Sequence, residues 1–165
     1  MKEDLFALIQ YRLEQAEDSI REAEVLLKEG MSLRSVMNRL YYAMFYAVLA
    51  LLQEKQLGTS KHYGAISLFD REFIKSGVFD QDMSKTLHRA FELRQKGDYM
   101  EQPGVKKENI DETFPKVVDF VKKDKTIPSQ REITMSLAVD NPILNNPSEE
   151  PVEFKSKCRE TNNAV

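Results

Sequence analysis

The sequence has very little cysteine, and this excludes two classes of structure. Cys158 is the single cysteine among 165 residues, so neither an intrachain disulfide nor a metal site built from several cysteines can form. The sequence also has no Gly-rich phosphate loop and no pair of histidines or carboxylates at a metal-ligand spacing. We therefore expect no metal and no cofactor.

An excess of positive charge is missing as well. Lys and Arg total 24 against 27 Asp and Glu, which gives no bulk electrostatic argument for binding nucleic acid. The longest strongly apolar run, residues 41–52, is too short to cross a bilayer and is typical of a buried helix. No charged n-region followed by an apolar h-region opens the sequence. We expect a cytoplasmic protein that does not contact a membrane.

What the chain does have is apolar residues at helical spacing. With 41% hydrophobic and 31% charged residues, it fits one domain with an ordinary core. Five segments are predicted to be helical. They run from Ile9 to Gly30, from Ser32 as a cap through Leu51, over about 61–75 with Ser60 as a cap and Gly77 at the end, from Asp80 or Asp82 to Gly97, and over 110–121.

The lengths of these segments and of their connections predict the fold class. Helices of one to two dozen residues joined by short loops predict an all-α, up-and-down bundle of four to five helices. The second helix is apolar around most of its circumference, so we expect it to be central. The fifth contains Pro115, and it either begins near this residue or kinks there.

Beyond Lys125 the composition changes. Prolines recur among Asn, Ser and Glu, and only residues 133–139 have an ordered pattern, either as a strand or as a docked segment. We therefore predict a helical bundle over residues 1–125 and a mostly irregular tail over residues 126–165.

The second predicted helix carries polar side chains within an otherwise apolar sequence. Arg39, Tyr42 and Tyr46 are at i, i+3 and i+7 and share one face of the helix. A buried Arg must be paired, and a buried phenol needs a hydrogen-bond partner. This face therefore marks either a functional site or a fixed buried network in which Arg39 pairs with a carboxylate such as Asp98.

Several short motifs together resemble one family of helical bundle proteins, the HEPN family. The motifs lie at residues 38–45 (Asn-Arg-Leu-Tyr-Tyr-Ala-Met-Phe), 50–52 (Ala-Leu-Leu), 60–62 (Ser-Lys-His) and 92–99 (Glu-Leu-Arg-Gln-Lys-Gly-Asp-Tyr). They are similar to a bacterial and archaeal branch marked by an Arg-x-Tyr-Tyr-Ala helix and a later Arg-x-x-x-Asp-Tyr. The resemblance covers roughly residues 5–123.

This resemblance implies a bundle that commonly dimerises and is often encoded beside a minimal nucleotidyltransferase as a toxin–antitoxin pair. Active members are metal-independent endoribonucleases whose signature is an Arg, then four to six intervening residues, and then a His. Arg39 matches the Arg, but Tyr46 occupies the position of the His. A phenol with an ordinary pKa near ~10 is a poor base at neutral pH.

Two hypotheses follow. The first is a non-nuclease, homodimeric binding module that pairs with a minimal nucleotidyltransferase and offers it a helical surface, with a tyrosine as a target of nucleotide transfer. The second is an endoribonuclease toxin with Arg39 and Tyr46 as catalytic residues. In both, RNA or a nucleotide is a candidate ligand. The residues expected to form a binding or structural network are Asn38, Tyr42, His62, Arg94, Asp98 and Tyr99.

Some of these residues also have simpler interpretations. Arg94 and Asp98 are four residues apart and could bridge along one helix. His62 begins the third predicted helix, where a capping or surface role is common. As a substitute base it would lie near the carboxyl end of the second helix, whereas Arg39 lies near the amino end. His88 is expected on a solvated face without a functional role.

Overall fold

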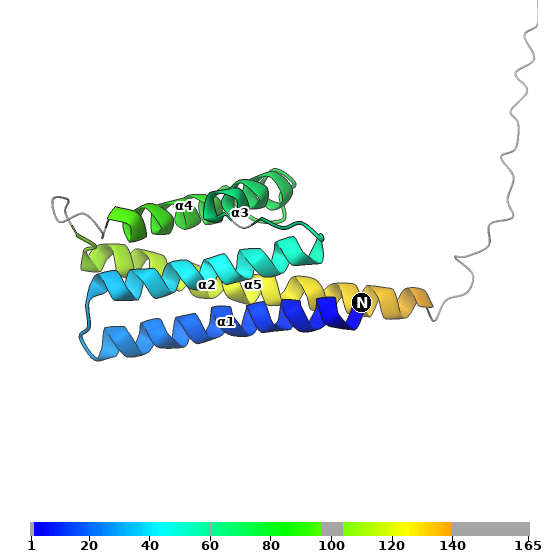
Figure 1. Cartoon of the computed structure of the whole chain (residues 1–165), viewed down its shortest axis with the longest axis horizontal. Helices are drawn as coiled ribbons and strands as arrows, with labels where there is room; N and C mark the ends of the chain where they lie inside the picture. The colour runs from blue at the N-terminus through cyan, green and yellow to red at the C-terminus, as the bar shows by residue number, and fades with distance from the viewer. Residues whose placement is uncertain (1, 60, 97–103, 140–165) are drawn as a thin grey trace, which may run out of the picture. The chain divides into compact units, whose positions relative to one another are not determined.

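The computed structural model of this chain describes residues 2–59, 61–96 and 104–139. Within these ranges it contains five α-helices and one π-helical turn, and no strand (Figure 1), so the all-α prediction is confirmed. The elements are α1 (Lys2–Lys28), α2 (Leu33–Glu54), α3 (His62–Phe69), η1 (Asp70–Ile74), α4 (Gln81–Lys96) and α5 (Lys107–Val139).

The chain divides into two compact units, residues 1–130 and residues 131–165. In the first unit, α2 lies between α1 on one side and α3 with α4 on the other (Figure 1). The neighbouring helices α1 and α2 run in opposite directions, as expected for an up-and-down bundle. In the second unit, the described residues 131–139 are the helical end of α5.

Helix α2 is the central helix, as its apolar circumference predicted. Eleven of its 22 residues are buried. It is also long and apolar enough to span a membrane, but 61% of that stretch is buried inside the protein. Burial against other helices therefore accounts for its hydrophobicity.

Glycines end two of the predicted helices. Gly30 follows α1 with φ +66°, and Gly77 follows η1 with φ +76°. Both are left-handed conformations that cost glycine little. After α2 the corresponding conformation belongs to Gln56, with φ +55°, and not to Gly58. Ser32 stands at the N-cap position of α2 but its side chain makes no capping hydrogen bond.

The fifth helix differs from both predictions made for its ends. It starts at Lys107, so a start near Pro115 is wrong, and residues 133–139 are helical, so a strand there is wrong. Pro115 cannot donate to the carbonyl of Asp111. The helix forms nevertheless because Ile110, before the proline, and Val117, after it, are both fully buried in the same core. The proposed division at Lys125 stays a prediction.

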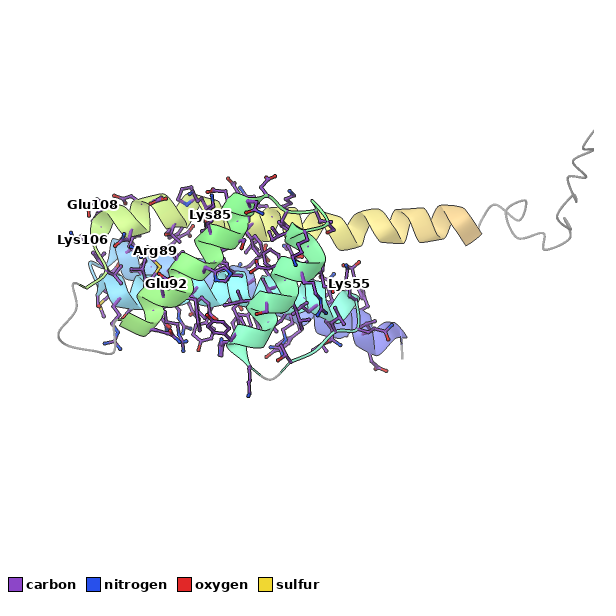
Figure 2. The ribbon with its side chains drawn as sticks, turned by 90° about the horizontal axis from the view of Figure 1, so that it is seen from above. Lys55, Lys85, Arg89, Glu92, Lys106 and Glu108 are labelled. Carbon is purple, nitrogen blue, oxygen red and sulfur yellow. The ribbon has the colours of Figure 1, made fainter. Side chains whose placement is uncertain are left out.

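Contacts with α5 also fix the position of α4. Lys116 of α5 forms an ion pair with Asp82 of α4, with 3.2 Å between Nζ and Oδ2. Arg89 of α4 lines a depression together with Asn109 and Glu112 at the beginning of α5 (Figure 2). Phe120 of α5 packs against Phe69 at the end of α3, at 5.5 Å between ring centres. These contacts hold α3 and α4 over the face of α2 that carries the predicted site.

Candidate functional site

Arg94 of α4 is the side chain that joins the predicted site residues. Its Nε donates a hydrogen bond to Oδ1 of Asn38 at 3.0 Å, and its Nη2 donates to the hydroxyl of Tyr42 at 3.1 Å. The guanidinium carbon lies 5.3 Å from the ring centre of Tyr41 and 5.1 Å from that of Tyr42. The structure thus brings Asn38, Tyr42 and Arg94 together in one network.

His62, at the start of α3, belongs to the same cluster. Its Nδ1 lies 2.8 Å from the Tyr41 hydroxyl, and its ring stacks on Phe45 with 4.3 Å between ring centres. The ring of Tyr42 is 6.2 Å away. Because Arg39 lies against Tyr42 as well, the expectation that His62 and Arg39 occupy opposite ends of α2 is wrong.

The chain after α2 explains this placement. Tyr41 lies 13 residues before Glu54, the last residue of α2, which is about 20 Å along the helix axis. Residues 55–61 can span about 23 Å when extended. The turn at Gln56 therefore allows this segment to run back along α2 and to begin α3 beside Tyr41.

The hydrogen bond between Tyr41 and His62 fixes the protonation pattern of both side chains. Tyr41 is fully buried, and among the described residues its hydroxyl has one recorded hydrogen-bond partner, Nδ1 of His62. A buried O–H group needs an acceptor. The phenol must therefore donate to Nδ1, and the proton of the neutral imidazole must be on Nε2.

The electrostatics favour the same neutral pair. Burial, and then the positive charge of Arg94, lower the pKa of His62 below its ordinary value. Burial raises the pKa of Tyr41, against the opposing effect of Arg94. At neutral pH the imidazole is therefore uncharged with its proton on Nε2, and the phenol stays protonated.

Arg39 is paired, but it is not deeply buried. Its Nη1 lies 3.0 Å from Oε2 of Glu22 on α1, and its side chain is 33% exposed while that of Glu22 is 54% exposed. The guanidinium carbon lies 5.2 Å from the ring centre of Tyr42. The carboxylate partner proposed from the sequence, Asp98, lies outside the described residues, as does Tyr99.

Tyr46 shares the face of Arg39 and Tyr42, as the helical spacing predicted. Its ring lies 5.8 Å from that of Tyr42, and the guanidinium carbon of Arg12 lies 6.0 Å from its centre. Arg39 and Tyr46 therefore both border Tyr42. The interactions recorded for Tyr46 in the described part of the chain are contacts with aromatic rings and with Arg12, and none is a hydrogen bond to a base.

Sequence reasoning missed three members of the cluster, Tyr41, Phe45 and Phe91. Phe91 of α4 lies 5.5 Å from the ring of Tyr41. Tyr41 directly precedes Tyr42 and does not lie on the helix face of Arg39, Tyr42 and Tyr46. The signal that could have identified it is a hydroxyl group within an apolar segment. His88, expected to be solvated, is half-exposed and lies 2.7 Å from Oδ2 of Asp70, away from this cluster.

A polar depression of about 410 Å³ opens beside Arg94. It is lined by Ser32, Arg34, Ser35, Asn38 and Arg94. Across the described ranges, no group of three or more His, Cys, Asp or Glu side chains converges as a metal site would. The site can therefore offer a cation, hydroxyl groups and an amide to a ligand.

The fold and this cluster define a small helical bundle whose central helix presents phenols and an amide to a cationic residue of a neighbouring helix. A family model for the HEPN domain matches residues 9–130. This chain belongs to the HEPN domain family, as its motifs indicated.

Individual relatives agree with this assignment. A UPF0332 protein of Thermotoga maritima is 40% identical over 114 residues, which are 69% of this chain and 86% of that protein. The Methanocaldococcus jannaschii protein named "Putative toxin MJ0142" is 34% identical over 113 residues, or 68% of this chain and 76% of that protein. A UPF0332 protein of Archaeoglobus fulgidus is 32% identical over 117 residues, or 71% and 92% of the two chains.

Proposed function

We propose that this chain is a HEPN binding module that forms a homodimer in the cytoplasm and pairs with a minimal nucleotidyltransferase in a toxin–antitoxin-like system. The observation that carries the proposal is the 2.8 Å contact between the Tyr41 hydroxyl and Nδ1 of His62, in which we infer that the buried phenol is the donor because it needs an acceptor. This hydrogen bond occupies Nδ1 of His62 while Nε2 carries the proton, so neither ring nitrogen is free to act as a base. The names of two relatives as toxins support the kind of system.

The chemistry of RNA cleavage explains why this observation favours binding. Cleavage through a 2′-hydroxyl needs a base near neutral pH and a cation for the phosphate. His62 carries its proton on Nε2, and burial raises the pKa of Tyr41. Arg39 is already paired with Glu22. The cluster supplies cations and donors but no evident base, which suits holding a ligand or partner.

The outer face of α1 is the surface we propose for the homodimer. Tyr11 is 53% exposed and Val25 is 59% exposed, and both are large apolar side chains. Val25 borders an apolar groove of about 470 Å³ that also contains Asp18, Arg21 and Glu22. In a two-fold dimer the same patch meets itself, so acids and a base within one patch can pair across the axis.

Co-purification tests the pairing. The full chain would be co-expressed with a small nucleotidyltransferase encoded beside its gene, and the complex measured by size-exclusion chromatography with light scattering. We expect a stable complex that contains two copies of this chain. Val25→Asp should yield monomers, whereas Lys107→Asp, at the exposed start of α5, should not. A wild-type chain that is monomeric and binds no nucleotidyltransferase would contradict the proposal.

The acceptor of nucleotide transfer can be tested in the same complex. Among the described tyrosines, Tyr63 is 68% exposed and accessible, whereas Tyr41 is fully buried. Mass spectrometry after incubation with ATP would locate a nucleotidylated tyrosine. Modification of Tyr41 in the folded protein would contradict the structure.

The second candidate is the endoribonuclease toxin that uses Arg39 and Tyr46. Their common contact with Tyr42 favours it, because both side chains lie on one face of α2. Purified wild type, Arg39→Ala and Tyr46→Phe would be incubated with total cellular RNA. Cleavage by the wild type that is lost in Arg39→Ala would establish the nuclease and overturn the binding module. Intact RNA together with normal growth on expression would exclude the toxin.

A further inference from the structure

Asp70 and His88 belong to a second polar cluster, where α4 meets η1. Nε2 of His88 lies 2.7 Å from Oδ2 of Asp70, and the hydroxyl of Ser84 donates a hydrogen bond to Oδ1 of Asp70 at 2.6 Å. Ser84 and His88 are four residues apart and share one face of α4. The side chain of His88 is 43% exposed and that of Asp70 is 31% exposed. The cluster is therefore fixed in geometry and open to solvent.

The backbone at Asp70 is unusual as well. Asp70 is the first residue of the π-helical turn η1, and its carbonyl oxygen accepts a hydrogen bond from the N–H group of Lys75, five residues later, at 3.0 Å. Single π-helical turns are rare in proteins and are frequent at functional sites. The chain thus has a rare turn at the residue whose carboxylate holds His88.

The carboxylate of Asp70 determines which ring nitrogen of His88 is reactive. An ionised carboxylate only accepts hydrogen bonds, so Nε2 of His88 is the donor, and the lone pair of the neutral imidazole is on Nδ1. Among the described residues, Nδ1 of His88 has no recorded partner. His62 has the reverse arrangement, because its Nδ1 accepts the hydroxyl of Tyr41. Of the two histidines, His88 is therefore the one with an available lone pair.

We propose that Nδ1 of His88 accepts a phosphoryl group from a donor in which phosphorus is bonded to nitrogen. The lone pair of Nδ1 forms a bond to phosphorus while the phosphorus–nitrogen bond of the donor breaks, and the protonated donor nitrogen leaves as a neutral amine with that electron pair. The ring becomes positively charged, and Asp70 stabilises this charge through Nε2. Loss of the Nε2 proton to water then gives the neutral phosphohistidine. Asp70 is a positioning residue in this step.

Lys85 supplies a positive charge for the phosphoryl group. It is exposed and lies three residues before His88 on α4, so the two side chains occupy neighbouring positions on the helix surface. In the described ranges no ion pair is recorded for Lys85, whereas Arg89, the residue after His88, is paired with Glu92. A cation within reach of His88 favours an anionic substituent over an uncharged one. The site does not depend on the homodimer or on the nucleotidyltransferase, so its test is separate from theirs.

Reaction of the full chain with phosphoramidate is the primary measurement. The folded protein, and separately the protein unfolded in urea, would be incubated with this reagent, and mass spectrometry of peptides kept at neutral pH would locate the modified histidine. In the folded protein we expect His88 to react and His62 not to react. His88 should react about tenfold faster in the folded than in the unfolded chain, which corresponds to ~1.4 kcal/mol. Equal modification of both histidines in the folded chain, or of neither, would overturn the proposal.

Asp70→Asn separates the charge of the carboxylate from its shape. The amide keeps an acceptor for Nε2 of His88 but cannot neutralise the ring, so modification of His88 should be about tenfold slower. Lys85→Gln should slow it by about threefold, as expected for the loss of one exposed charge. Lys107→Gln, which removes an equally exposed lysine at the start of α5, is the control and should react at the wild-type rate. Equal rates in wild type and a folded Asp70→Asn would overturn the role of Asp70.

The tautomer of His88 gives a readout that a purely structural role of Asp70 would not change. Nitrogen-15 NMR of the neutral ring should show the proton on Nε2 in wild type, and this preference should be lost in Asp70→Ala. Thermal unfolding would establish that each variant is folded at the temperature of the assay. A proton on Nδ1 in wild type, or the same tautomer in a folded Asp70→Ala, would overturn the assignment of Nδ1 as the acceptor atom.

Discussion

The hydroxyl of Tyr41 and Nδ1 of His62 lie 2.8 Å apart and connect the middle of α2 to the start of α3. The two groups keep each other neutral, because the buried phenol needs the imidazole as an acceptor and a protonated imidazole would offer none. Burial favours the neutral form of each group, because it raises the pKa of Tyr41 and lowers the pKa of His62.

Removing the phenolic hydroxyl should release this constraint. In Tyr41→Phe, Nδ1 of His62 loses its donor, so the neutral imidazole is less favoured and the pKa of His62 should rise relative to wild type. The loss of one buried hydrogen bond should also lower the free energy of unfolding by about 1 kcal/mol. NMR titration of the His62 ring would measure the pKa. A pKa that falls or does not move would mean that the phenol is not the donor.

The lowered pKa of His62 also predicts how stability depends on pH. Since the folded-state pKa is below the ordinary value of about 6.5, the unfolded chain binds more protons between these two values. Stability from this group is complete above pH 6.5 and decreases as the pH falls through that window. Thermal unfolding from pH 7.5 to 5 should show a decrease that is smaller in His62→Gln. Equal slopes in the two proteins would contradict this.

Asp124 of α5 has the opposite dependence. Its side chain is fully buried, neither carboxylate oxygen has a hydrogen-bond partner among the described residues, and burial followed by the nearby Glu54 raises its pKa well above 3.8. The folded state therefore binds the extra proton, and stability decreases as the pH rises above 3.8 toward the folded-state pKa.

Asp124→Asn should therefore stabilise the protein at pH 8, by about 1 kcal/mol or more, because the amide cannot ionise in the core. Below pH 4 the variant and the wild type should unfold at nearly the same temperature. Asp119→Asn, on the same helix, is the control and should show no such dependence. A destabilised Asp124→Asn at pH 8 would show that the carboxylate is used as an ion.

Arg39 and Arg94 should differ in their effect on stability. Arg39 is one-third exposed, so its pair with Glu22 should be worth at most about 1 kcal/mol, and the contact with Tyr42 another ~0.5–1. Arg94→Gln removes two part-buried hydrogen bonds and two ring contacts, and should cost about 2–3 kcal/mol. Urea unfolding would rank them, with Arg89→Gln on the exposed side of α4 close to wild type (Figure 2). A larger loss of unfolding free energy in Arg39→Ala than in Arg94→Gln would overturn this ranking.

Periodicity in the sequence predicted the helices and the central position of α2, because the apolar residues that make each helix are also the residues that it buries. Arg39, Tyr42 and Tyr46 share one face of α2 for the same reason, since spacing along a single helix fixes their directions. Relations within one helix were therefore accessible from the sequence, as were the helix ends at Gly30 and Gly77, whereas the cap predicted at Ser32 makes no side-chain hydrogen bond.

Contacts between different helices could not be predicted from the sequence. The position of His62 depends on the direction that the chain takes after the turn at Gln56, and no local pattern indicates that direction. The partner of Arg39 is Glu22, 17 residues earlier, and many carboxylates were equally plausible partners. A start of α5 near Pro115 was wrong because the effect of Pro115 on its helix is local, whereas the burial of Ile110 and Val117 that outweighs it is tertiary.

The end of the folded domain is the last testable point. Residues 126–139 continue α5, and the compact unit ends at residue 130. A chain shortened after Gln130 should therefore unfold within about 0.5 kcal/mol of the full chain, because the cut follows the boundary of the compact unit. Shortening after Lys125 deprives the last carbonyl groups of the helix of their N–H partners, beside the buried Asp124 and the ion pair between Lys125 and Glu17. That chain should be less stable than the first but still folded. A large loss of stability in both would mean that residues 131–165 contribute to the fold.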